Sequence, residues 1–179
     1  MNRDCYIKAY VEFVQEWKAG NKRFPDFSDY TLSEPVLFLL GGHCPKGKCF
    51  LSIIESEDDH WFENTHDFIQ WVYPLNEPSR SLRHAPVLTA MDIKFLQHNF
   101  SAMHHLLALS GRMKRFWQTN QHWIKHYDHN HLRITRAIKS LRLILGDQHA
   151  EEFKQWLYDL LGSDIKKINE NTQQFWKRA

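Results

Sequence analysis

His-Asn-His-Leu-Arg-Ile-Thr-Arg-Ala-Ile-Lys-Ser-Leu, residues 129–141, is the stretch that decides how this chain folds. Ile134, Ile138 and Leu141 recur at intervals of four and three, the spacing that brings side chains onto one side of an α-helix. This pattern predicts an amphipathic helix with one apolar face toward a core, ending at Gly146.

A second face of the same predicted helix carries two arginines. Arg133 and Arg136 lie three residues apart and therefore project together. Arginine is suited to bidentate contacts with carboxylate or phosphate groups, so the pair predicts an anion-binding surface. The alternative is structural, with both guanidinium groups paired to carboxylates of the same fold such as Glu63 or Asp67.

Apolar residues at helical spacing predict further helices along the chain, over about residues 6–17, 58–73, 89–107, 147–161 and 163–175. Two capping boxes are expected, Thr31 with Glu34 and Thr89 with Asp92. After the second box, the residues expected to face the core are Ile93, Leu96, Phe100, Met103 and Leu107. Gly111 is expected to interrupt the helix after these residues.

The composition favours one globular fold. The chain has 179 residues, of which 42% are hydrophobic and 14% aromatic, enough for a real core. We expect an all-α, single-domain bundle of about six to eight helices over residues 1–179, with at most a minor short strand near residues 49–54. Residues 1–54 are expected to be a helical and loop extension packed on the rest.

Charge and cysteine content restrict the partners. A formal charge of +2, from 23 basic and 21 acidic residues, gives no field for nucleic acid, so no nucleic-acid partner is expected. Three cysteines are too few for a secreted disulfide framework. The longest apolar run, residues 36–40, is far short of the ~20 needed to span a bilayer. We therefore expect a cytoplasmic protein, with peripheral membrane contact and a protein partner left open.

Two motifs resemble a known family. Residues 63–78 read Glu-Asn-Thr-His-Asp-Phe-Ile-Gln-Trp-Val-Tyr-Pro-Leu-Asn-Glu-Pro, which resembles the first signature of the opioid growth factor receptor conserved region. Residues 129–136, followed by Ser140-Leu141, are similar to that family's second signature. The resemblance covers about residues 55–161 and includes the order of the two blocks. It implies a helical domain of the short, stand-alone, bacterial type.

The resemblance also implies what members of the family do. Vertebrate members are described as receptors for the pentapeptide Met-enkephalin, with nuclear and membrane-associated locations. We therefore expect a binding module rather than an enzyme, with a small anionic ligand or a short peptide as its partner and no cofactor. The ligand-binding residues expected from the two motifs together are His66, Gln70, Trp71, His129, Asn130, Arg133 and Arg136.

The chain's twelve histidines leave a rival hypothesis open. His122 and His126 have the four-residue spacing of helical zinc ligands, and His129, His131 and Asp128 follow closely. A metal-dependent hydrolase built on this cluster is one alternative to a binding domain, and a purely structural interaction domain is another. Because the glutamate of a His-Glu-x-x-His motif is missing, we expect no metal site and no catalytic residue. Many histidines also predict stability that changes with pH.

Overall fold

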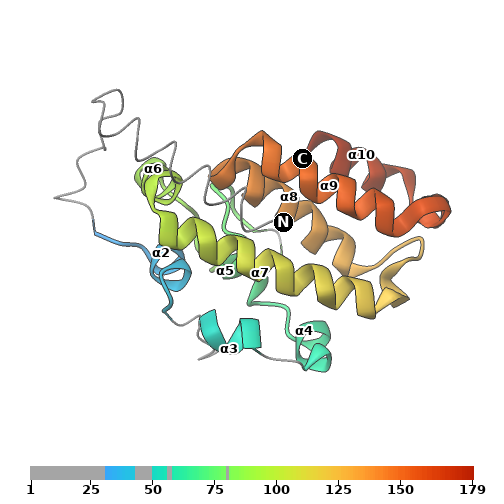
Figure 1. The fold of residues 1–179 in the computed structure, drawn as a ribbon, viewed down its shortest axis with the longest axis horizontal. Helices are drawn as coiled ribbons and strands as arrows, with labels where there is room; N and C mark the ends of the chain where they lie inside the picture. The colour runs from blue at the N-terminus through green and yellow to red at the C-terminus, as the bar shows by residue number, and fades with distance from the viewer. Residues whose placement is uncertain (1–30, 43–49, 56–57, 80) are drawn as a thin grey trace. The chain divides into compact units, whose positions relative to one another are not determined.

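The computed structural model describes residues 31–42, 50–55, 58–79 and 81–179, and every regular element within them is helical (Figure 1). The α-helices are α2 (Glu34–Leu39), α3 (Phe50–Glu55), α4 (Asp59–Asn64), α5 (Ile69–Val72), α6 (Ala90–His98), α7 (Phe100–Thr119), α8 (His129–Leu145), α9 (Asp147–Leu161) and α10 (Glu170–Arg178). Two 3-10 helices, η1 (Gln121–Trp123) and η2 (Gly162–Lys167), lie between them. The all-α prediction is confirmed.

The predictions for the N-terminal residues are only partly open to comparison. The helix expected over residues 6–17, and its packing on the rest of the chain, lie outside the described residues. Residues 49–54, left open between strand and helix, fall almost entirely in α3. The first capping box is wrong: α2 begins at Glu34 with Ser33 as its N-cap. The Ser33 hydroxyl instead donates to the Asp92 carboxylate at 2.6 Å.

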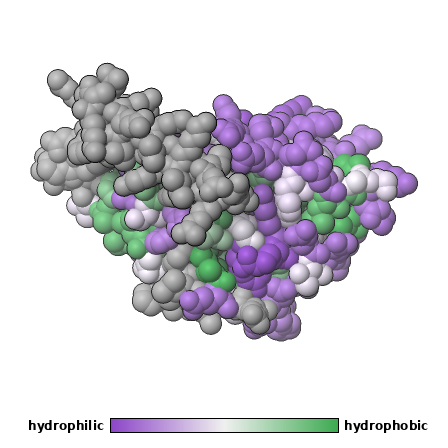
Figure 2. Space-filling model, viewed as in Figure 1, coloured by the Kyte–Doolittle hydropathy of each residue, from purple (hydrophilic) through white to green (hydrophobic). Residues whose placement is uncertain are grey.

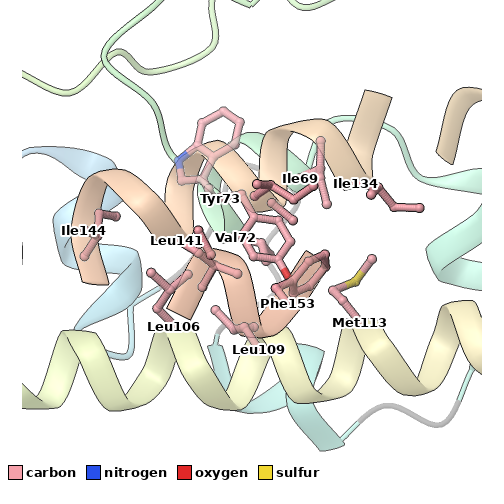
Figure 3. Packing of buried hydrophobic residues seen from close by; sticks show 14 of the residues in the cluster. Ile69, Val72, Tyr73, Leu106, Leu109, Met113, Ile134, Leu141, Ile144 and Phe153 are labelled. Carbon is pink, nitrogen blue, oxygen red and sulfur yellow. The ribbon is translucent and has the colours of Figure 1, made fainter. Parts of the chain in front are cut away.

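The core lies where α5, α7, α8 and α9 meet. Figure 3 shows Val72, Leu106, Leu141 and Phe153, one residue from each of these helices, packed together, and all four are at most 2% exposed. Burying each such side chain stabilises the fold by roughly 1.5–3 kcal/mol. The face drawn in Figure 2 is mainly hydrophilic over the C-terminal helices, as expected for amphipathic helices that bury one side.

The helix expected over residues 58–73 is two helices. Asp58 caps α4 by accepting a hydrogen bond from the Trp61 amide, and Thr65 ends it with an extended backbone (φ −97°, ψ 121°). The chain turns helical again only at Ile69. The periodicity was consistent with one helix because Trp61, Phe68 and Val72 still face the core. Between the two helices, however, the backbone carbonyl oxygen of Thr65 is bonded to the Arg133 side chain of α8.

The helix expected over residues 89–107 is also divided, here by Asn99. The second capping box is confirmed, with Thr89 and Asp92 bonding reciprocally. Asn99 ends α6 and caps α7, since its side chain accepts from the Ala102 amide at 3.0 Å. The break changes which residues face inward. Phe100, Met103 and Leu107, predicted to face the core, are only partly buried, and the buried residues of α7 include Ala102, Leu106, Leu109, Met113 and Phe116.

Two further expectations need correction. Gly111 does not interrupt the helix, because α7 continues through it from Phe100 to Thr119. The last predicted helix, residues 163–175, is divided into η2 and α10, and Asn169 rather than Ser163 caps the longer part. No helix in the described residues is long and apolar enough to cross a bilayer.

Candidate functional site

The two sequence motifs meet through Arg133 of α8. Its Nη1 donates to the backbone carbonyl oxygen of Phe62 at 2.7 Å, and its Nη2 donates to that of Thr65 at 2.7 Å. Nη1 also donates to the Asn130 side-chain oxygen at 3.2 Å. The last carbonyls of a helix have no partner within the helix. Arg133 supplies that partner for the end of α4 and thereby fixes the turn toward α5.

Arg136 and Ser140 continue this pattern along α8. Arg136 Nε donates to the carbonyl oxygen of Tyr73 at 2.7 Å, and the Ser140 hydroxyl donates to that of Pro74 at 2.9 Å. These residues follow Arg133 at steps of three and four, so all three lie on one face of α8. That face is polar because it binds the carbonyl oxygens at the ends of α4 and α5.

Both arginines remain charged at neutral pH despite their burial. Burial lowers the pKa of Arg133 to about 10, against the opposing charges of Glu63 and Asp128. Burial likewise lowers the pKa of Arg136 to about 10, with Glu77 opposing it. The structural alternative predicted from the sequence had carboxylates as the hydrogen-bond acceptors of the two arginines. The acceptors found are mainly backbone oxygens, with carboxylate charges farther away.

At the start of α8 lies a second polar group, which we call the carboxylate–histidine cluster: Glu63, His122, Asp128 and His129. The Glu63 Oε1 atom lies 3.0 Å from His122 Nε2 and 3.3 Å from His129 Nε2. Asp128 Oδ1 lies 3.6 Å from the other ring nitrogen of His129. The His66 ring stacks on that of His129, with 4.9 Å between the ring centroids and 29° between their planes.

The buried Asn130 amide holds the two carboxylates of this cluster. Its Nδ2 lies 3.2 Å from Glu63 Oε2 and 3.0 Å from Asp128 Oδ1. Asp128 is also the N-cap of α8, accepting from the Asn130 backbone amide at 2.8 Å. Asn130 Oδ1 accepts from Trp117 Nε1 at 3.1 Å as well as from Arg133. With 0% exposure, Asn130 connects the cluster to the core.

The cluster shifts the pKa values of its members. Burial raises the pKa of Glu63, but hydrogen bonds from His122 and Asn130 outweigh it and leave the pKa below its usual value. Burial also raises the pKa of Asp128, and hydrogen bonds from Asn130 and Lys125 bring it below its usual value. Burial and the charge of Arg133 lower the pKa of His129. At neutral pH the cluster therefore has two carboxylates and an uncharged His129.

Gln70 and Trp71, on α5, have contacts of a different kind. They are only 2% and 3% exposed. Gln70 Nε2 lies 3.5 Å from the Ser79 hydroxyl. Four buried polar atoms around α5 find no hydrogen-bond partner among the residues that the structure describes: Gln70 Oε1, Trp71 Nε1, Tyr73 Oη and Arg136 Nη2. Such atoms are uncommon in folded proteins.

The residues expected to bind ligand thus fall into two sets by their contacts. His66, His129, Asn130 and Arg133 are joined around the carboxylate–histidine cluster. Gln70, Trp71 and Arg136 belong to α5 or bind its end, and we call these three the α5 site. The single shared site expected from the sequence remains a prediction. The central position of Glu63 in the cluster was not predicted from the sequence. Its place one helical turn before His66 was the only feature that could have indicated it.

The histidines expected to act together separate in the structure. His131 is buried, 3% exposed, and its Nε2 lies 2.9 Å from the Trp123 carbonyl oxygen. The His126 ring packs edge-on against Tyr127 at 4.4 Å. Of the candidate metal-ligating residues around η1 and the start of α8, only His122, Asp128 and His129 lie in the cluster with Glu63.

The fold and these two polar groups define a class of protein: an all-helical domain in which one helix, through a polar face, organises the ends of two short preceding helices. Residues 50–121 match the sequence model of the family described as the opioid growth factor receptor conserved region. This match confirms the resemblance and shows that residues 50–121 are similar to the family. The second motif lies beyond the matched span.

Individual relatives agree with the family match. The chain is 25% identical over 153 residues to the opioid growth factor receptor of Rattus norvegicus, covering 72% of this chain and 26% of the relative. It is 29% identical over 170 residues to that of Homo sapiens, covering 83% and 23%. Opioid growth factor receptor-like protein 1 of Mus musculus is 29% identical over 109 residues, covering 51% and 22%. The chain thus spans about a quarter of these relatives' length. No solved structure matches it.

Proposed function

We propose that this chain is a receptor-type binding domain that takes a short peptide, or another small ligand with a carboxylate, at the α5 site. One observation carries the proposal: two donors and one acceptor of the α5 site are buried and have no hydrogen-bond partner among the described residues. They are Arg136 Nη2, Trp71 Nε1 and Gln70 Oε1. A buried polar atom without a partner costs about 1–3 kcal/mol, so a ligand that pairs with it relieves that cost.

The three atoms suit the end of a peptide. A carboxylate accepts hydrogen bonds from Arg136 Nη2 and Trp71 Nε1, and charge-assisted bonds of this kind are strong. Gln70 Oε1 accepts from a peptide N–H. Arg136 is preoriented for this role, because its Nε is already bonded to the Tyr73 carbonyl oxygen at 2.7 Å, so little side-chain freedom is lost on binding.

The remaining predicted residues take a supporting role in this proposal. Arg133 and Asn130 hold α4 and the start of α8, while His66 and His129 stack beside them. The relatives are named opioid growth factor receptors, which is why a peptide is the first ligand to test. We further propose binding rather than catalysis as the activity, and a cytoplasmic location.

A second candidate is a purely structural interaction domain. It is favoured by the polar face of α8, because Arg133, Arg136 and Ser140 all donate to backbone carbonyl oxygens. On this reading the motifs serve to dock helices against one another. The two candidates differ in whether removing a donor from the α5 site changes ligand affinity without changing stability.

Calorimetric titration with two peptides tests the proposal. Met-enkephalin, the peptide implied by the family resemblance, has a free C-terminal carboxylate, and its C-terminal amide has none. We expect the acid to bind and the amide to bind at least tenfold more weakly. Trp71→Phe and Arg136→Lys should each weaken binding of the acid by about 10- to 100-fold, the value of one hydrogen bond to a charged group.

Trp156→Phe is the matched control, since it makes the same change on α9. It should leave the affinity unchanged. The proposal fails if neither peptide binds, or if Trp71→Phe and Arg136→Lys bind as the unaltered chain does. Thermal unfolding of each variant shows whether the fold is retained, and a large loss of stability with no separate effect on affinity would favour the structural candidate.

A further inference from the structure

The carboxylate–histidine cluster has the dimensions of a metal site. Glu63, Asp128 and His129 each offer one ligand atom, and these atoms all lie within 4.8 Å of one another. His129 Nε2 and Glu63 Oε1 are 3.3 Å apart. In a tetrahedral zinc site with bonds of about 2.0–2.1 Å, neighbouring ligand atoms are about 3.3 Å apart. An ion at His129 Nε2 can therefore bind Glu63 with little movement of either side chain, while Asp128 Oδ1, which faces the other ring nitrogen, has to move toward the ion.

His122 offers a fourth ligand from a different element. Its Nε2 lies 3.0 Å from the same Glu63 oxygen that faces His129, and its side chain is 46% exposed. An exposed imidazole on the short η1 turn can adjust its rotamer toward an ion held by the other three. Together the four residues supply two nitrogen and two oxygen ligands, a set that suits zinc and similar divalent transition metals.

His129 is in contact with both carboxylates of the cluster. A neutral His129 imidazole carries one N–H and one lone pair. Yet its two ring nitrogens face two carboxylates, Glu63 Oε1 at 3.3 Å and Asp128 Oδ1 at 3.6 Å. When Nε2 holds the proton, the Nδ1 lone pair faces the Asp128 oxygen. When Nδ1 holds it, the Nε2 lone pair faces Glu63 Oε1, with Asn130 Nδ2 as a donor 3.4 Å away. A cation between that lone pair and the carboxylate turns a repulsive contact into an attractive one.

Neighbouring groups hold the ligands in position. Asn130 Nδ2 lies 3.2 Å from Glu63 Oε2 and 3.0 Å from Asp128 Oδ1, while the His66 ring stacks on that of His129. Metal-binding histidines and carboxylates in proteins are usually oriented by contacts of this kind. Two positive charges oppose a cation: Lys125, 3.0 Å from Asp128 Oδ2, and Arg133, whose guanidinium is bonded to the end of α4.

We propose that Glu63, Asp128, His129 and His122 form a binding site for one divalent transition metal ion, with zinc as the best fit. The site differs from the rival zinc-binding set considered from the sequence, because His126 has no part in it and Glu63 does. It also uses none of the three residues of the α5 site, so the two proposals stand or fall separately.

Titration of the chelator-treated chain with Zn²⁺ alone, with no peptide present, tests this proposal. We expect one equivalent of Zn²⁺ to bind. Glu63→Gln, which removes the charged ligand shared by both histidines, should lower the affinity at least tenfold, and His122→Ala should lower it less. His126→Ala is the matched control, since His126 is also exposed and lies four residues from His122, and it should leave the affinity unchanged.

Three results would overturn the proposal. The first is no stoichiometric binding of Zn²⁺. The second is that the Glu63→Gln and His122→Ala variants keep the circular dichroism spectrum of the unaltered chain and bind Zn²⁺ with the same affinity. The third is loss of binding in His126→Ala with none in His122→Ala. If Glu63→Gln fails to fold, the pair of histidine variants decides, because both side chains are exposed and neither is in the core.

Discussion

Arg133 donates a hydrogen bond from Nη2 to the backbone carbonyl oxygen of Thr65 at 2.7 Å, between residues 68 positions apart in the sequence. The same guanidinium donates to the Phe62 carbonyl oxygen. One side chain of the second motif therefore fixes where the helix of the first motif ends. The two motifs thus depend on each other for structure.

Replacing this arginine should destabilise the fold. Arg133→Gln leaves the carbonyl oxygens of Phe62 and Thr65 without their charged donor in a buried place, so we expect a loss of roughly 2–4 kcal/mol in the free energy of unfolding. Urea unfolding measures it. Lys139→Gln, on the same helix, is the control: its ion pair with Glu77 is exposed, and such pairs contribute about 0–1 kcal/mol. Equal losses in both variants would argue against this role for Arg133.

Ser140 tests the same polar face without a change of charge. Its hydroxyl donates to the Pro74 carbonyl oxygen at 2.9 Å, and the residue is 0% exposed. Ser140→Ala removes the donor and leaves the oxygen buried, so we expect a loss of about 1–2 kcal/mol. The urea midpoint should fall with the slope unchanged. An unaltered midpoint would mean that the Pro74 oxygen finds another donor.

The sequence predicted the helical class because periodicity reports burial, and burial is what the core requires. The helix over residues 129–145 was predicted almost residue for residue, with Ile134, Ile138 and Leu141 buried as expected. The breaks at Thr65 and Asn99 were missed. At Thr65 the apolar residues on both sides of the break still face the core, so the pattern of hydrophobicity carries no mark of it. At Asn99 the buried face changes from the residues predicted to face the core to residues such as Ala102 and Leu106.

The candidate site was harder to predict than the fold. The sequence identified Arg133 and Arg136 as functional or paired, but their acceptors are backbone oxygens, which have no signature in the sequence. The arrangement around Glu63 depends on η1 and α8 bringing His122 and His129 to one oxygen atom. Spacing along a chain predicts neighbours on one helix, and this cluster joins three elements.

Replacing Gly111 and Gly146 with alanine should change the stability of the fold in opposite directions. Gly111 lies inside α7, and an added Cβ would meet nothing within 4 Å, so Gly111→Ala should stabilise the fold by about 0.5–1 kcal/mol through helix propensity. Gly146 joins α8 to α9 with φ +91° and ψ 176°, a conformation that only glycine adopts readily. Gly146→Ala should destabilise by about 1–3 kcal/mol. Thermal unfolding of both variants measures the contrast, and a shift of the same sign in both would contradict the assigned backbone roles.

Acidification should weaken the fold through His131. Burial lowers the pKa of this imidazole, although its contact with the Trp123 carbonyl oxygen partly opposes the shift. The unfolded chain therefore takes up a proton at this position near pH 6.5, while the folded chain resists it until a lower pH. Stability contributed by His131 is complete above about pH 6.5 and is lost as the pH falls toward the folded pKa, by at most about 1.4 kcal/mol per pH unit. His129, whose pKa is also lowered, adds loss in the same direction.

Melting temperatures between pH 5 and 8 should fall on the acid side. His131→Gln, which keeps a donor for the Trp123 oxygen but does not titrate, should show a smaller fall. Parallel curves for the two proteins would exclude His131 as a source of the pH dependence.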